Sequence, residues 1–83
     1  MENQLVSVRL DDDTDEIAKI VSETDTTYVI RYLRKKAYNE CNVYKYSKRT
    51  TEIEKECVSG FYDTTNEEDI GFERDGEEFI EYS

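Results

Sequence analysis

The sequence contains no histidine, and this absence excludes several kinds of catalytic and metal site. Without imidazole the chain cannot form a Ser-His-Asp triad, a Cys-His nucleophile pair or a histidine-ligated metal centre. Cys41 and Cys57 are the only cysteines and cannot fill a tetrahedral zinc site by themselves. The three glycines form no phosphate-binding loop motif. We therefore expect a protein that is not an enzyme and that has no cofactor and no bound metal.

Long apolar runs are also missing. The first ten residues lack a basic region followed by an apolar stretch, so we do not expect a signal peptide. Apolar runs are far shorter than the roughly 20 residues that span a bilayer, and we expect no membrane partner. Two cysteines fall short of the disulfide framework of a small secreted scaffold, which favours free thiols. We predict an intracellular location, in cytoplasm, nucleus or virion.

Charge and aromatic side chains are what the sequence does contain. The 83 residues include 21 acidic and 11 basic groups, with a net charge of −10, together with seven tyrosines and three phenylalanines. A domain of this size buries only about 60% of the surface of its unfolded chain. The chain is therefore predicted to have a thin core, and it is either marginally stable alone or completed by a partner.

The basic residues are concentrated in the centre of the sequence. Residues 31–49 hold seven basic groups and one acidic group, whereas the segments 1–30 and 50–83 are both acidic. Two interpretations are open: acidic ends that fold over a basic face, or a phosphate-binding face with interleaved tyrosines. We favour the first and do not expect nucleic acid as a direct ligand, because the net charge of −10 repels it. The basic face comprises Arg31, Arg34, Lys35, Lys36, Lys45, Lys48 and Arg49.

Alternation of apolar and polar residues predicts β-strands over 6–10, 17–21, 27–33 and 43–46. Residues 11–15, 22–27 and 47–50 are predicted turns, and 34–42 a loop. A helix over 30–40 is a competing interpretation, because Ile30, Leu33 and Ala37 follow helical spacing. Residues 51–54 fit either a capping box before a short helix or another strand. Apolar residues on both sides of Asp75-Gly76 predict a terminal hairpin.

One acidic segment resembles a calcium-binding loop in part. Asp11, Asp13 and Asp15 match the first ligands of such a loop. The match then fails, because Glu16 stands where glycine makes the sharp turn and Ser22 where a bidentate glutamate is needed. We predict a solvated turn.

Six aromatic residues fall on or beside the predicted strands. Such rings can form a cage that attracts a methylated ammonium group, or they can fill and cover the thin core. We favour the second role for most of them, and we predict that the exposed part of the group contacts a partner. The predicted patch comprises Tyr28, Tyr32, Tyr44, Tyr46, Phe61 and Tyr62.

The order of these segments is similar to that of a known family. VSVRL, EIAKIV, YVIRYL, VYKY and the closing EIEKECVSGFYD resemble a Tudor or Agenet-type SH3-like barrel over residues 4–62. The resemblance implies a small five-stranded bent barrel that binds partner peptides, often with methylated Lys or Arg in an aromatic cage. The chain departs from the pattern because it has no tryptophan and no aromatic residue in its first strand.

The predicted fold is therefore all-β, with an SH3-like (Tudor-like) five-stranded bent barrel over residues 1–62. An acidic C-terminal extension, residues 63–83, packs on the barrel or on a partner. The predicted function is a non-catalytic protein-interaction module that docks on a protein partner through its sheet edge and aromatic patch. The alternatives are a structural small subunit or cementing piece of a large assembly such as a virus, and a Tudor-like reader of methylated Lys or Arg in a chromatin or nucleic-acid-associated complex.

Overall fold

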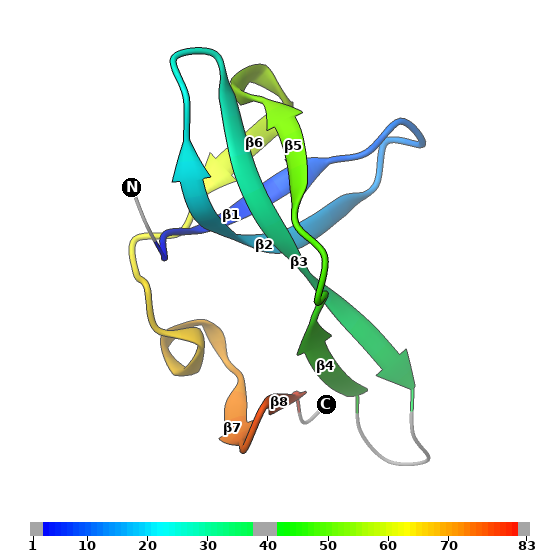
Figure 1. Cartoon of the computed structure of the whole chain (residues 1–83). Helices are drawn as coiled ribbons and strands as arrows, with labels where there is room; N and C mark the ends of the chain where they lie inside the picture. The colour runs from blue at the N-terminus through cyan, green and yellow to red at the C-terminus, as the bar shows by residue number, and fades with distance from the viewer. Residues whose placement is uncertain (1–2, 38–41, 82–83) are drawn as a thin grey trace.

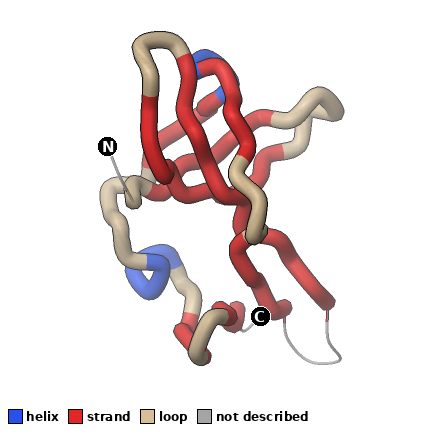
Figure 2. The backbone as a smooth tube through the Cα atoms, in the orientation of Figure 1, coloured by secondary structure: helices blue, strands red, loops and turns tan. Residues whose placement is uncertain are grey.

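The computed structural model describes residues 3–37 and 42–81, and β-strands dominate this part of the chain (Figures 1 and 2). The predicted all-β class is confirmed. The strands are β1 (Leu5–Arg9), β2 (Asp15–Glu23), β3 (Thr27–Ala37), β4 (Asn42–Tyr46), β5 (Thr51–Glu54), β6 (Val58–Phe61), β7 (Glu73–Asp75) and β8 (Glu78–Glu81). Two short 3-10 helices are also present, η1 (Lys55–Cys57) and η2 (Glu67–Ile70). No helix in the described ranges is long and apolar enough to cross a membrane.

The strands form one antiparallel sheet in the order β6-β1-β2-β3-β4-β8-β7. The long strand β3 joins its two parts (Figure 1). Residues 27–30 of β3 pair with β5, and residues 33–37 pair with β4. The part with β1, β2, β5 and β6 lies at one end of the molecule, and β4, β7 and β8 lie at the other (Figure 1).

The structure corrects the predictions for the middle of the chain. β3 continues to Ala37 and β4 begins at Asn42, so the loop predicted over 34–42 is wrong for these end residues. The competing helix over 30–40 is also wrong for its described part. Ile30 and Leu33 are both buried but belong to different apolar clusters. Since side chains three apart in a strand point to opposite faces, a strand with two apolar faces imitated helical spacing.

Residues 51–61 form two strands rather than one. Thr51 begins β5, which pairs with β3 through the partners Tyr28 and Ile53, so the helix interpretation of 51–54 is wrong. The 3-10 helix η1 then separates β5 from β6. The described part of 4–62 therefore holds six strands, not the predicted five.

Two apolar clusters lie on opposite faces of β3. The first core contains Val6, Val8, Ala18, Ile20, Tyr28, Ile30 and Tyr32, with Leu10, Ile53, Cys57 and Val58 packed against it. The second core contains Leu33, Phe72 and Phe79, with Ile17, Tyr44, Tyr46 and Ile70 packed against it. The segment from η2 to β8 therefore covers the face of β3 that the first core does not use.

Local turn chemistry directs the C-terminal segment onto that face. The Asn66 side chain accepts a hydrogen bond from the Glu68 N–H at 3.0 Å and caps η2. Gly71 ends η2 with a φ of 106°, a left-handed conformation that favours glycine, and Phe72 follows it into the second core. The predicted hairpin around Asp75-Gly76 is confirmed, with β7 and β8 on either side and Gly76 at a φ of 64°.

Candidate functional site

The six aromatic residues predicted as a patch are divided between the two cores. Tyr28 and Tyr32 are buried in the first core, whereas Tyr44 and Tyr46 pack half-buried against the second. Phe61 is the most exposed large apolar residue described, with 51% of its surface accessible, and Tyr62 is half-buried. The structure thus brings only Tyr28 and Phe61 of this group into a ring contact with each other. A partner-binding role for these residues stays a prediction.

The exposed Phe61 makes an edge-to-face contact with Tyr28 of the first core. Their ring centroids are 6.2 Å apart with an interplanar angle of 78°. The Lys55 Nζ lies 5.1 Å from the centre of the Tyr28 ring and 3.0 Å from the Glu23 carboxylate. The chain's own ammonium group therefore already contacts the Tyr28 ring, while Phe61 remains accessible.

Strand β6, which ends at Phe61, is a free edge of the sheet. In the described part of the chain β6 pairs with β1 alone. The Tyr62 N–H donates to the Leu5 carbonyl on β1 at 3.0 Å. Because successive N–H groups of a strand point in opposite directions, the Phe61 N–H is directed away from β1. The sequence of β6, VSGF, contains no charged residue and no proline. The strands β5 (TEIE) and β7 (ERD) both contain charged residues.

Several carboxylates lie near β6. The Ser59 hydroxyl on β6 lies 3.4 Å from an Asp15 carboxylate oxygen. Glu56 in η1 precedes β6, and a hydrogen bond with Glu56 together with its negative charge raises the pKa of Glu54. Asp63 follows β6 and is exposed. The segments that precede and follow the uncharged strand therefore carry exposed carboxylates, Glu56 and Asp63.

The predicted basic residues do not form a single face. Arg31, Lys45 and Lys48 line a cavity beside the C-terminal segment. Arg34 lies over the ring of Tyr32, 5.4 Å from its centroid, and so belongs to the first-core side of the sheet. The others, Lys35, Lys36 and Arg49, are exposed.

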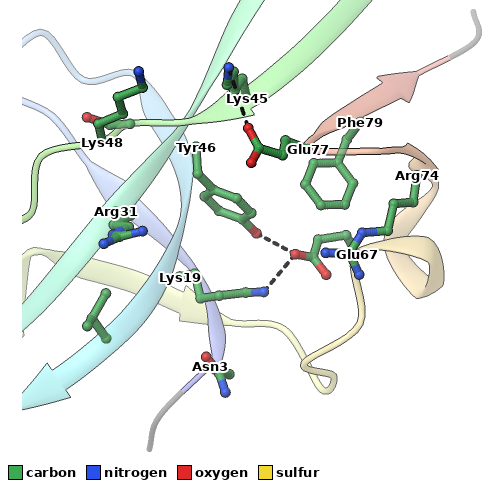
Figure 3. A pocket seen from close by; sticks show the side chains of 12 residues that line it. Asn3, Lys19, Arg31, Lys45, Tyr46, Lys48, Glu67, Arg74, Glu77 and Phe79 are labelled. Atoms are coloured by element: carbon green, nitrogen blue, oxygen red, sulfur yellow. Dashed lines mark hydrogen bonds and ion pairs between the residues drawn. The ribbon is translucent and has the colours of Figure 1, made fainter.

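A buried carboxylate, Glu67, was not anticipated from the sequence. Only 5% of Glu67 is exposed, and one of its oxygens accepts from Lys19 Nζ at 2.7 Å and from the Tyr46 hydroxyl at 2.8 Å (Figure 3). Burial alone raises the pKa of Glu67, but the hydrogen bonds from Lys19, its own backbone and Tyr46 outweigh burial and hold this pKa below its ordinary value. Burial, and then the hydrogen bond to Glu67, raise the pKa of Tyr46, which therefore stays protonated and donates. Nothing in the acidic run around Glu67 distinguishes it from its exposed neighbours.

The acidic segment 11–15 and Cys57 are not part of a metal-binding group among the described residues. Residues 11–15 are exposed and include the predicted turn, where the hydroxyl and N–H of Thr14 donate to Asp12 and lower its pKa. Cys57 is a half-buried free thiol, and Cys41 lies outside the described residues. Within the ranges that the structure describes, no three His, Cys, Asp or Glu side chains are grouped to hold a metal.

Comparisons with protein-family models, with curated proteins and with solved structures found no match for the chain. The similarity to a Tudor or Agenet-type barrel therefore stays a prediction. The candidate binding surfaces are the β6 edge with Phe61 and the cavity beside the C-terminal segment.

Proposed function

We propose that the chain is a non-catalytic protein-interaction module that binds an extended, Lys- or Arg-containing segment of a partner protein along the edge of β6. The observation that carries this proposal is a strand with no partner on its outer side in the described ranges, which contains no charge or proline and ends in the exposed Phe61. Edge strands are normally protected by charged residues, proline or a covering element, because their free backbone groups pair readily with other chains.

The backbone and the aromatic ring of this edge supply complementary contacts. A partner strand added beside β6 would accept a hydrogen bond from the outward Phe61 N–H, in the manner of β-strand addition. The Phe61 ring, held by its edge-to-face contact with Tyr28, offers an apolar surface that is already oriented. An ordered aromatic group loses little conformational entropy on binding, and such residues dominate binding energy at interfaces.

Charge complementarity determines the chemistry of the partner. Glu56 and Asp63 lie on either side of β6 in the sequence, Asp15 lies near Ser59 on β6, and the neighbouring Glu56 raises the pKa of Glu54. A basic segment would reduce this repulsion and would also be attracted at long range by the net charge of −10.

We further propose that the part of the sheet around the first core is an SH3-like barrel. The run β6-β1-β2-β3-β5 places five antiparallel strands around one apolar cluster, and η1 connects the two outer strands. Recognition of a methylated side chain is less well supported than docking of a strand, because Lys55 already lies over the Tyr28 ring.

The proposal is tested by titrating the labelled protein with an extended peptide of alternating lysine and valine while recording amide chemical shifts. We expect the largest shifts in residues 58–62, and no binding of the matched glutamate–valine peptide. Phe61→Ala should weaken binding about tenfold. Phe61→Pro, which also removes the outward N–H, should weaken it further.

Val21→Ala is the matched control, because Val21 is the other exposed large apolar side chain described, at 38%, and lies away from β6. Equal losses in Val21→Ala and Phe61→Ala, or shifts confined to another edge, would contradict docking at β6. A melting curve of the isolated chain then separates a module from an obligate structural subunit. We expect a cooperative transition, whereas its absence would favour the subunit.

A further inference from the structure

A cavity of about 600 Å³ lies between the outer face of the sheet and the C-terminal segment (Figure 3). Lys19 and Arg31 reach it from β2 and β3, and Tyr46 from β4. Arg74 and Phe79 close it from β7 and β8. Its volume is within the range of roughly 300–1,000 Å³ that small-molecule sites occupy. The cavity shares no lining residue with the β6 edge, so the proposed docking at β6 assigns no role to it.

The charge of the cavity is opposite to that of the chain. Among the residues that the structure describes, five cationic side chains and two carboxylates line it, although the whole chain carries a net charge of −10. The cationic residues are Lys19, Arg31, Lys45, Lys48 and Arg74, and the acidic residues are Glu67 and Glu77. A concave surface with excess positive charge concentrates anions, because the low-dielectric walls focus the field.

Most of this positive charge is not neutralised from within. Glu67 is already engaged by Lys19 and Tyr46. The side chain of Glu77 is 88% exposed and lies 3.9 Å from Lys45, a weak contact. Arg31, Lys48 and Arg74 form no ion pair with any carboxylate in the described ranges.

The unpaired cations lie on two sides of the cavity. Figure 3 shows Arg31 and Lys48 on one side of Tyr46 and the Lys19–Glu67 pair, and Arg74 on the other. Arg74 lies over the Phe79 ring, 5.6 Å from its centroid, and lines the cavity together with Tyr46. An anion in the cavity could therefore receive hydrogen bonds from more than one direction.

We propose that this cavity binds a small phosphate-bearing anion. A phosphate group has several acceptor oxygens around one centre and carries up to two negative charges, which suits guanidinium donors on opposing walls. Phe79, Tyr46 and Val21 give the same cavity apolar surface for the organic part of a phosphate ester. An adjoining cavity of about 430 Å³ shares Asn3, Lys19, Glu67 and Arg74 with it, so there is room beyond a single phosphate group.

Calorimetric titration of the full chain at low salt tests the proposal. The probes are inorganic phosphate, pyrophosphate and ATP, with citrate as a carboxylate of similar charge. We expect saturable binding of pyrophosphate and ATP, weaker binding of phosphate, and no comparable binding of citrate. The probes also distinguish whether the ligand is a free phosphate or a phosphate ester with an apolar part.

Two arginine substitutions and a charge-matched control locate the site. Arg31→Ala and Arg74→Ala should each weaken pyrophosphate binding about tenfold or more, because each removes a charge-assisted donor. Arg49→Ala removes the same charge from an exposed position outside the cavity and should change affinity less than twofold. Unchanged melting curves for the three variants would show that each is folded.

A second pair of variants works in the opposite direction. Glu77→Gln removes a carboxylate from the cavity and should tighten pyrophosphate binding several-fold, whereas Glu78→Gln, next to it and outside the cavity, should not. Absence of saturable binding by any phosphate probe would overturn the proposal. Equal effects of Arg31→Ala and Arg49→Ala, equal effects of Glu77→Gln and Glu78→Gln, or equally tight citrate binding would overturn it as well.

Discussion

The first and second cores share strand β3 but differ in the types of residue that they contain. The first core is mainly aliphatic, and Val6, Ala18, Ile20 and Ile30 have no accessible surface at all. The second core has three buried residues, two of them phenylalanines, and its rings meet edge to face. Buried Glu67 lies at its margin, where it binds Lys19 and Tyr46.

This difference has a consequence for stability. Five strands contribute to the first core, whereas the second forms between one sheet face and a segment whose strand β7 is fully exposed. Regions with few buried contacts open locally at a lower free energy than the global unfolding of the chain. We expect the C-terminal segment to detach while the first core stays folded, but not the reverse, because β3 belongs to both.

The largest expected effect is in the first core. Ile30→Ala should lower the free energy of unfolding by about 2–5 kcal/mol, because it leaves a cavity among fully buried neighbours. Urea denaturation followed by circular dichroism and by amide signals of β8 should show both regions unfolding together. Val29→Ala, on the opposite face of the same strand and only half-buried, is the control. An equal loss in both variants would contradict the assignment of the first core.

Phe79→Ala tests the second core in the same way. Replacing a buried phenylalanine by alanine in a single cooperative core lowers the free energy of unfolding by about 3–5 kcal/mol. For Phe79→Ala we expect a loss of about 2–3 kcal/mol, because detachment of the C-terminal segment limits it. Hydrogen exchange should become faster in β7 and β8 while β1 and β2 remain protected. Ile80→Ala, whose side chain points to the other face of β8, serves as control. Faster exchange throughout β1 and β2 would show that the two cores are not separable.

The alternation of apolar residues was sufficient to predict β1, β2 and the first part of β3, but not the strand β6 or the second face of β3. Ile30 and Leu33 are three positions apart, which a helix and a strand buried on both faces explain equally well. What decides between them is Phe72 and Phe79, which lie some forty residues later and cover Leu33. Spacing within one segment carries no information about such a partner.

The candidate surfaces show the same limit. Phe61 is exposed and Tyr28 is buried because β6 lies at the edge of the sheet. The order of the strands in the sheet cannot be predicted from the local pattern of apolar residues. The concentration of positive charge in 31–49 was visible in the sequence, but Arg31 and Arg34 lie on different faces because side chains three apart in the strand β3 point in opposite directions. Asp75-Gly76 was predictable because turn chemistry is local.

Glu67 makes the second core sensitive to acid. Its pKa is lowered in the folded chain, so its contribution to stability is complete above the ordinary pKa of a glutamate and is lost as the pH falls through the lowered value. Glu67→Gln should cost about 1–2 kcal/mol at neutral pH, since it weakens the contacts with Lys19 and Tyr46. Melting temperatures recorded between pH 7 and pH 3 should then fall less steeply than in the wild type. The exposed neighbour gives the control Glu68→Gln, which should keep the wild-type acid profile.

The smallest expected effect comes from a single hydroxyl group in the second core. Tyr46→Phe removes the donor to Glu67 but keeps the ring that meets Phe79 at 5.6 Å, so we expect a loss of about 0.5–1.5 kcal/mol. The pKa of Glu67 should rise towards its ordinary value, because one of the hydrogen bonds that lowers it is gone. Destabilisation by acid should therefore begin at a higher pH, which carboxylate chemical shifts and melting curves both measure. Tyr44→Phe is the matched control, because Tyr44 packs in the same core through its ring contact with Phe72 and does not touch Glu67. If Tyr44→Phe moved the titration of Glu67 as far as Tyr46→Phe, the shift would come from loosening of the core rather than from the lost hydrogen bond.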